Sequence, residues 1–168
     1  HSETSQDILL SHLAKADFVF HLAGINRTND IADFQKGNVE LTKFIVDSLI
    51  KFGRDVPLVF SSSTQAVQDN PYGKSKFEAE QAVQLYSECT LSPHYIYRFP
   101  NVFGKWCRPN YNSFVSTFCY NIINAIEISV NAASAVVNLV YIDDVCASLI
   151  SLLDGKSKPG FHSVPNEF

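Results

Sequence analysis

Two short runs of mostly apolar residues constrain the fold of this chain more than any other feature. They cover residues 17–24 and 57–63, and each is long enough for a strand but too short for an ordinary helix. Neither run alternates apolar with polar residues, which is the pattern of a parallel strand buried on both faces. We therefore predict two buried strands, the first closed by Gly24 and the second opening into a polar loop.

Segments with helical periodicity separate these runs and follow them. A long amphipathic helix is predicted from Val39 to Ile50, and another helix begins after Pro71. A third strand is predicted at 95–100. The remaining expectations are a helix at 7–13, a helix at 113–125, extended segments at 126–130 and 136–142, and a helix at 145–153 capped by Asp143 or Asp144. Strands alternating with helices predict an α/β fold with a parallel sheet, whose ligands bind at the carboxyl ends of the strands.

Composition excludes several classes of protein. With 168 residues, 46% of them apolar, the chain can bury a core as one domain. A net charge of −4 and the lack of a basic run argue against nucleic-acid binding. No apolar stretch is long enough for a membrane span, and the first residues are polar, unlike a secretory signal. The four cysteines are scattered without a CxxC pair, so we expect reduced thiols, a cytoplasmic location and no metal site.

Candidate catalytic residues follow the second predicted strand. Tyr72 and Lys76 stand four residues apart, so on a helix they lie one turn apart on the same face. The lysine charge there would favour the tyrosinate and make the phenol a usable general acid or base. The hydroxyl run 61–64 lies just upstream. These residues on their own leave Ser62, Ser63 and Thr64 equally eligible to bind a substrate carbonyl.

Other polar residues have simpler interpretations from the sequence. We expect His21 to be a packed core histidine, because no second metal ligand accompanies it at a suitable spacing. Asn38 could be a helix cap. The segment 103–112 is rich in aromatic, cationic and amide side chains, which suit a diphosphate and a base, although an ordinary loop with one buried Trp would have the same composition. Asp143 and Asp144 receive no catalytic role.

Six motifs, in order along the chain, resemble the extended short-chain dehydrogenase/reductases, also called the NAD-dependent epimerase/dehydratase family. The motifs are His21–Gly24, Asn38–Thr42, Ser61–Ser63, Tyr72–Lys76, Arg98–Gly104 and Tyr141–Val145. The stretches 61–71 and 103–113 are more narrowly similar to bacterial UDP-sugar 4-ketoreductases of capsular polysaccharide synthesis. The resemblance implies a Rossmann-like doubly wound parallel sheet and the reduction of a UDP-linked 4-keto sugar in the synthesis of a capsular or surface polysaccharide.

The resemblance also implies roles for individual residues. Ser63, Tyr72 and Lys76 would be catalytic. The cofactor-binding residues would be Leu22, Ala23, Gly24, Asn38, Ser61, Tyr72, Lys76, Pro100 and Asn101. The substrate-binding residues would be Ser63, Asn101, Lys105, Trp106, Arg108, Tyr111 and Asn112. The resemblance favours NADP(H) over NAD(H), and implies a homodimer formed through the helix that carries Tyr72.

Two alternatives remain open. The parent protein could be a nucleotide-sugar epimerase, which shares the same three catalytic residues; a dehydratase is disfavoured because Thr64-Gln65 stands where dehydratases carry an Asp-Glu pair. A non-catalytic cofactor-binding protein on the same fold is the other alternative. Such proteins commonly lose the Tyr or the Lys, and this chain keeps both.

One departure from the family pattern concerns the start of the fold. The family begins with a strand, a glycine-rich turn and a helix that hold the cofactor's pyrophosphate. The seven glycines of this chain form no such turn. We therefore expect residues 1–168 to be a partial cofactor-binding domain that lacks its first βαβ strands and is truncated at both ends. The substrate-binding region would begin within 103–140, and the 168 residues alone would be inactive.

Overall fold

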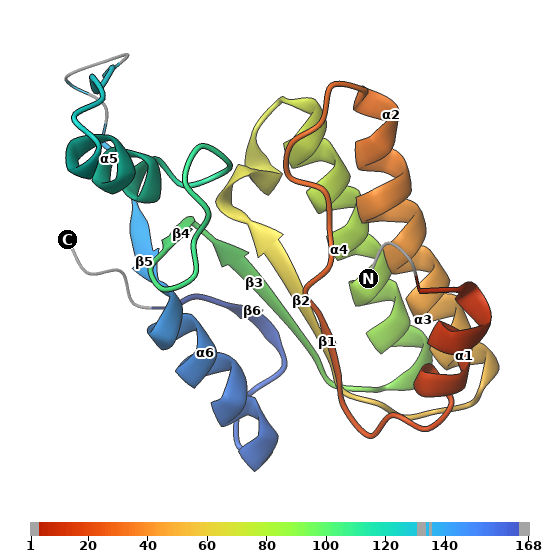
Figure 1. Ribbon diagram of the computed structural model, residues 1–168. Coiled ribbons are helices and arrows are strands. Elements are labelled where there is room, and N and C mark those ends of the chain that lie inside the picture. The colour runs from red at the N-terminus through yellow and green to blue at the C-terminus, as the bar shows by residue number, and fades with distance from the viewer. Residues whose placement is uncertain (1–3, 131–133, 135, 165–168) are drawn as a thin grey trace. The chain divides into compact units, whose positions relative to one another are not determined.

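The computed structural model describes residues 4–130, 134 and 136–164, and the chain divides into two units (Figure 1). Unit 1 comprises residues 1–98 and 158–163, and unit 2 comprises 99–157 and 164–168. The elements of unit 1 are α1 (Gln6–Leu13), β1 (Val19–His21), α2 (Ile31–Phe34), the π-helix η1 (Gln35–Glu40), α3 (Leu41–Lys51), β2 (Leu58–Ser63), the 3₁₀-helix η2 (Thr64–Val67), α4 (Pro71–Thr90), β3 (His94–Phe99) and β6 (Gly160–His162).

The sheet of unit 1 has the strand order β1-β2-β3-β6. β1 pairs with β2 in parallel, with His21 opposite Phe60, and β3 pairs with β6 in parallel. The predicted α/β class and parallel pairing are therefore confirmed. The first strand is shorter than predicted, because its pairing stops at His21.

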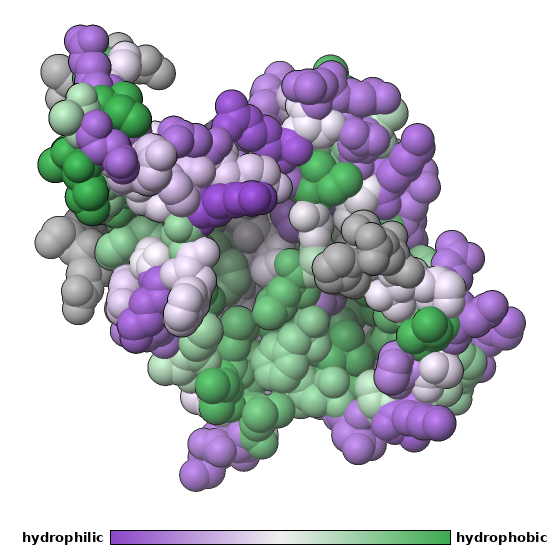
Figure 2. Space-filling view, viewed as in Figure 1, coloured by the Kyte–Doolittle hydropathy of each residue, from purple (hydrophilic) through white to green (hydrophobic). Residues whose placement is uncertain are grey.

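One face of this sheet is covered by α1, α3 and α4 (Figure 1). Alternate residues of β2, including Leu58 and Phe60, point into this core, where they meet apolar side chains of the three helices. The other residues of the strands point to the opposite face. There, Phe18 stacks on Phe20 with ring centroids 4.7 Å apart. Figure 2 shows hydrophobic surface over β1, where Phe20 and Leu22 are exposed.

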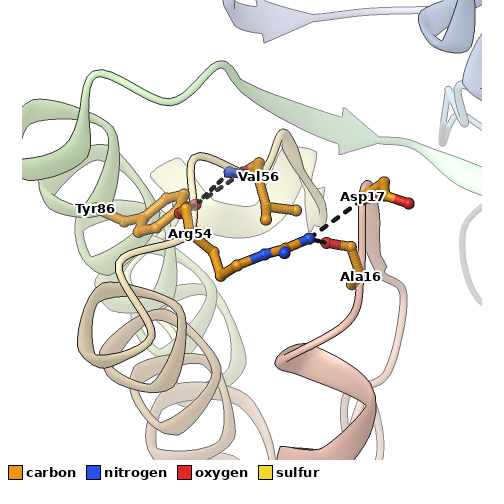
Figure 3. A network of polar contacts seen from close by, with 5 residues as sticks. All are labelled: Ala16, Asp17, Arg54, Val56 and Tyr86. Carbon is orange, nitrogen blue, oxygen red and sulfur yellow. Dashed lines mark hydrogen bonds and ion pairs between the residues drawn. The ribbon is translucent and has the colours of Figure 1, made fainter.

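A polar network fixes the amino-terminal end of this sheet (Figure 3). The Arg54 guanidinium, in the loop before β2, donates to the Ala16 carbonyl at 2.6 Å and pairs with Asp17. The Tyr86 hydroxyl of α4 donates to the Val56 carbonyl at 2.8 Å and accepts from the Val56 amide. Tyr86 is fully buried, so one phenol satisfies backbone groups that water cannot reach.

Unit 2 has a two-stranded parallel sheet of β4 (Asn101–Phe103) and β5 (Leu139–Tyr141). Its helices are α5 (Phe114–Ile123), α6 (Ile142–Ser151) and the 3₁₀-helix η3 (Leu152–Asp154). The prediction for 126–130 was wrong, since these residues form no strand. β4 and β6 were not predicted; each is only three residues long and carries too little pattern to be recognised.

The predicted cap of the last helix was also wrong. Tyr141 occupies the N-cap position of α6, and both aspartates lie within its first turn. There, carboxylates stabilise the helix through its dipole rather than by capping an amide. The Asp143 carboxylate also pairs with Lys105 at 2.6 Å.

Candidate active site

The carboxyl ends of β1 and β2 bring two predicted motifs of unit 1 together. Because the strands are parallel neighbours, the segment 22–24 leaves the same edge of the sheet as the hydroxyl run 61–63. Leu22, Ala23 and Gly24 are exposed there, whereas Ser62 and Ser63 are buried. The two segments therefore lie side by side at one edge of the sheet.

The beginning of α4 places Tyr72 next to the hydroxyl run. Asn70 caps the helix by accepting from the Gly73 amide at 2.7 Å, and Pro71 occupies the first turn. A Cβ atom on Gly73 would lie 2.2 Å from the Gln65 carbonyl oxygen. Glycine at this position therefore allows the first turn of α4 to pack directly on η2, and this contact fixes where Tyr72 lies.

Tyr72 is half-buried, and its ring lies 5.7 Å from that of Phe34. Burial raises the pKa of the phenol above its ordinary value of 10.0, and the hydrogen bond from Ser63 opposes that rise. The sequence led us to expect that the lysine charge would lower this pKa. That expectation was wrong for the protein by itself, because desolvation of the phenolate outweighs the favourable contacts.

Lys76 is buried one turn further along α4. Its ammonium donates to the Ser61 carbonyl at 2.9 Å and lies 4.9 Å from the centre of the Phe60 ring. Burial lowers the pKa of Lys76 from 10.5 to about 8, while the charge of Glu80 acts in the opposite direction. The side chain is therefore charged at neutral pH but close to its titration range.

Asn38 lies in the π-helix η1 and is buried, so it is not a helix cap. Its amide oxygen accepts from the Ile25 amide at 2.7 Å, and its nitrogen donates to the Ile25 carbonyl and to the Ser75 hydroxyl, each at 2.9 Å. Asn38 thus ties the segment after β1 to the helix of Tyr72 and Lys76. Single π-turns within helices are frequent at functional sites.

Gly24 packs against this group. A Cβ atom at this position would lie 2.8 Å from the Asn38 amide oxygen and 3.0 Å from the Lys76 ammonium. The missing side chain is therefore required for the close approach of the β1 end to Lys76. The sequence indicated only that the backbone would be open to a ligand.

His21 is a buried core histidine, as predicted. Its Nε2 atom lies 2.8 Å from the Thr42 hydroxyl, which itself donates to the Asn38 carbonyl at 2.6 Å. The hydroxyl proton is therefore used, so Nε2 must be the donor in this pair. Burial, with a smaller contribution from Lys76, lowers the pKa of His21 from 6.5 to about 4, so the ring is neutral at pH 7.

The remaining predicted residues lie in unit 2. Pro100 precedes β4, and Asn101 is its first residue, with its amide bonded to the Asn138 carbonyl at 3.2 Å, rather than part of a loop. The first half of the loop 104–113 is held by two contacts within this unit. Lys105 pairs with Asp143 of α6, and the Cys107 carbonyl accepts from Ser116 of α5 at 2.9 Å.

Trp106 is almost fully exposed, at 99%, and has a left-handed backbone with φ 65°. The alternative of an ordinary loop with a buried Trp is therefore wrong. A bulky residue in this conformation is unusual and marks a candidate functional position. Arg108, Tyr111 and Asn112 are also exposed on this loop.

The sequence suggested no role for two residues next to this site. Glu80 is buried on α4, and Arg98 on β3 makes a two-pronged ion pair with it, at 2.9 and 2.6 Å. The spacing from Tyr72 through Lys76 to Glu80, four residues at each step, was available as a signal.

Within the described residues, no group of three or more His, Cys, Asp or Glu could hold a metal ion. None of the helices in this part of the chain has the length and apolar character of a membrane span.

Comparison with known proteins identifies similar sequences. The sequence model of the NAD dependent epimerase/dehydratase family matches residues 2–162. The UDP-2-acetamido-2,6-beta-L-arabino-hexul-4-ose reductase of Pseudomonas aeruginosa is 49% identical over 154 residues, which are 92% of this chain and 41% of that enzyme.

Solved structures are similar as well. The capsular polysaccharide assembling protein CapF of Staphylococcus aureus superposes with a TM-score of 0.85 at 44% identity, over 100% of this chain and 46% of that one. The UDP-glucuronic acid 4-epimerase of Bacillus cereus has a TM-score of 0.84 at 17% identity, over 99% of this chain and 58% of that one. The second similarity concerns the fold alone. The chain spans less than half the length of the reductase and of CapF.

Proposed function

The chain belongs to the NAD dependent epimerase/dehydratase family, and from this membership we propose that it is part of an NADP(H)-dependent reductase of a UDP-linked 4-keto sugar. The reaction would serve the synthesis of a capsular or surface polysaccharide. The observation that carries the proposal is the convergence of Ser63, Tyr72 and Lys76 at the carboxyl end of β2, in a chain 49% identical to a UDP-sugar reductase.

The chemistry of these residues suits a proton donor. The raised pKa keeps the Tyr72 phenol protonated at neutral pH, so its Oη atom can give a proton to the carbonyl oxygen of a keto sugar. The Ser63 hydroxyl, which contacts Tyr72, can donate a hydrogen bond to the same oxygen. The Lys76 ammonium would then stabilise the phenolate that remains after proton transfer.

The nicotinamide cofactor would supply the hydride. The residues after β1 fit such a group, because 22–24 are exposed and Gly24 has no side chain to block the backbone. We assign the cofactor contacts to Leu22, Ala23, Gly24, Asn38, Ser61, Tyr72, Lys76, Pro100 and Asn101. The preference for NADP(H) over NAD(H) is part of the proposal, and measuring KM for both cofactors tests it.

The UDP group is assigned to the loop 104–113 of unit 2, with Asn101 in the strand before it. Exposed Trp106 offers a stacking surface, and Arg108 can pair with a phosphate in the two-pronged geometry of a guanidinium. Tyr111 and Asn112 would add hydrogen bonds. The Lys105 charge already faces Asp143, so we expect it to position this loop as well as attract the diphosphate.

Three further parts of the proposal concern the whole protein. Strands that pair with the outer edge of β1 among the described residues, with helices over the face that carries Phe20, would complete a doubly wound sheet. The groove between α3 and α4, lined by Val46, Ile50 and Leu85 among others, would pair with a second copy. Sedimentation of the full-length protein tests that dimer. A cytoplasmic location is supported by four free cysteines.

Replacement of the proton donor tests the proposed function. In the full-length protein, Tyr72→Phe should lower kcat for NADPH oxidation with a UDP-4-keto sugar by about 100-fold or more, because the carbonyl oxygen loses its acid. The matched control is Tyr120→Phe, which alters an exposed tyrosine of α5 and should leave kcat unchanged. Ordinary turnover by the Tyr72→Phe variant would contradict the assignment. Interconversion of UDP-hexoses without net NADPH oxidation by the wild-type protein would instead identify an epimerase.

A further inference from the structure

Glu80 is the most deeply buried acidic side chain near the proposed catalytic residues. It lies on α4, four residues after Lys76, with a side chain only 1% exposed. Removing a carboxylate from water is costly unless charged or hydrogen-bonding partners replace the lost hydration. The partners of Glu80 therefore show which parts of the fold it holds.

The first partner lies in the hydroxyl run. The Ser62 hydroxyl donates to Glu80 Oε1. Ser62 stands between two residues that contact the proposed catalytic pair, because the Ser61 carbonyl accepts from Lys76 at 2.9 Å and the Ser63 hydroxyl bonds Tyr72. Alternate side chains of a strand project from opposite faces of the sheet. Glu80 therefore binds this strand end on the face of the Ser62 side chain, and the side chains of Ser61 and Ser63 project from the other face.

The second partner is Arg98 on β3. Its Nε atom donates to Glu80 Oε1 at 2.9 Å and its Nη2 atom to Oε2 at 2.6 Å. The guanidinium carbon also lies 4.6 Å from the centre of the Phe161 ring of β6. A two-pronged pair of this kind fixes direction as well as distance. Glu80 thus joins α4 to β2 and, through Arg98, to β3 and β6.

The groups around Lys76 set the electrostatic environment of its ammonium. Of the titratable groups in the described residues, Glu80 on α4 and His21 on β1 interact electrostatically with Lys76, and Arg98 on β3 lies beyond Glu80. His21 is neutral at pH 7, and Arg98 is positive. Glu80 is therefore the negative charge that opposes the effect of burial on the ammonium.

We propose that Glu80 is a positioning residue of the reductase site, which fixes the strand end 61–63 and places a carboxylate one helical turn from Lys76 on α4. The inference rests on the proposed function, in which the Lys76 cation assists proton transfer from Tyr72. Glu80 does not touch the reacting atoms; it acts through Ser62 and Lys76.

The pH dependence of turnover in the full-length protein separates this role from a purely structural one. Glu80→Gln keeps the size of the side chain, removes its charge and replaces one of its two acceptor oxygens with a donor amide. The alkaline limb of the kcat profile should move to lower pH by about one unit, because Lys76 then loses its proton more easily. Glu80→Asp restores the charge and should keep the wild-type limb, even if kcat falls. Glu78→Gln is the matched control, since Glu78 is an exposed neighbour on α4 paired with Lys43, and should change neither quantity.

A second readout does not depend on turnover. In spectra of lysine labelled with ¹³C at Cε, the Lys76 signal can be assigned with a Lys76→Met variant and titrated directly. We expect Glu80→Gln to titrate at lower pH than the wild type, and an unchanged titration would overturn the proposal. If the shift occurs but the wild-type protein reduces no UDP-4-keto sugar, the role of Glu80 in holding the charge stands and the proposed function fails.

Ser62→Ala covers the case in which Glu80→Gln does not fold. This variant removes one hydrogen bond from Glu80 and leaves its charge in place. Misplacement of the strand end should lower kcat about tenfold without moving the alkaline limb. Full turnover by Ser62→Ala would overturn the positioning role.

Discussion

At the scale of single residues, burial decides the acid–base properties of the site. Tyr72, Lys76 and His21 all have pKa values displaced in the direction that favours the neutral form, and desolvation is the largest cause for each. Hydrogen bonds and neighbouring charges make smaller changes to each of these pKa values. A phenol that keeps its proton and an ammonium near its titration range are what a proton-donating site requires.

His21 provides a test of this burial through stability. The folded protein keeps the ring neutral down to about pH 4, whereas the unfolded chain takes up a proton below the ordinary value of 6.5. The unfolded state therefore binds more protons in this window, and stability falls as pH falls through it. Relative to His21→Gln, which can still donate to Thr42, the wild-type protein should lose about 2 kcal/mol of unfolding free energy between pH 7 and pH 5.

Urea unfolding of both full-length proteins at the two pH values measures this difference. Loss of the imidazole packing should lower the free energy of unfolding by a similar amount at either pH. Only the change in that free energy between the two pH values therefore reports on the titration of His21. Equal losses in the wild type and in His21→Gln would mean that folding leaves the pKa of His21 at its ordinary value.

At the scale of elements, short polar contacts place the helices that carry the site. Asn38 in η1 bonds the segment after β1 and the Ser75 hydroxyl of α4, while Gly73 allows α4 to pack on η2. At the other end of the sheet, Tyr86 holds α4 against the loop before β2. α4 is thus fixed near both ends, and Tyr72, Lys76 and Glu80 lie along it between these contacts.

Tyr86→Phe tests the fixing of α4. The change keeps the ring but leaves the buried amide of Val56 without its partner, so the full-length protein should lose about 1–3 kcal/mol of unfolding free energy. Chemical denaturation measures the loss. The control, Tyr120→Phe on the exposed face of α5, should change stability by less than about 0.5 kcal/mol. Similar stabilities for both variants would show that the Tyr86 hydroxyl contributes nothing.

At the scale of the whole molecule, the chain carries the proposed catalytic residues Ser63, Tyr72 and Lys76. None of its seven glycines forms the turn that cradles a dinucleotide's pyrophosphate in this family, and the chain spans 41% of the reductase and 46% of CapF. We propose that the exposed segment 22–24 receives the nicotinamide half of the cofactor.

Cofactor affinity should therefore differ between the 168 residues alone and the full-length protein. We expect calorimetry to detect NADPH binding by the full-length protein and none by the isolated chain at micromolar concentration, because the 168 residues contain no glycine-rich turn of the kind that holds a pyrophosphate. A circular dichroism spectrum of the isolated chain is the control for folding. Specific micromolar binding by the folded isolated chain would contradict this prediction.

The α/β class, the order of the main elements and the candidate site residues could be predicted from local patterns in the sequence. The apolar run 57–63 and the start of α4 at Pro71 are set by residues close together in the chain. Such patterns can be recognised in the sequence before the fold is known. For the same reason, strands as short as β4 and β6 and the cap of α6 were missed or misplaced, since their identity depends on partners distant in sequence.

The environments of these residues became clear only from the folded structure. Asn38 is a buried link between two segments rather than a cap, burial outweighs the Ser63 hydrogen bond in setting the pKa of Tyr72, and Glu80 pairs with Arg98 next to the site. The physical reason is that desolvation and ion pairing depend on neighbours from several elements, and the spacing of residues along one helix does not specify them.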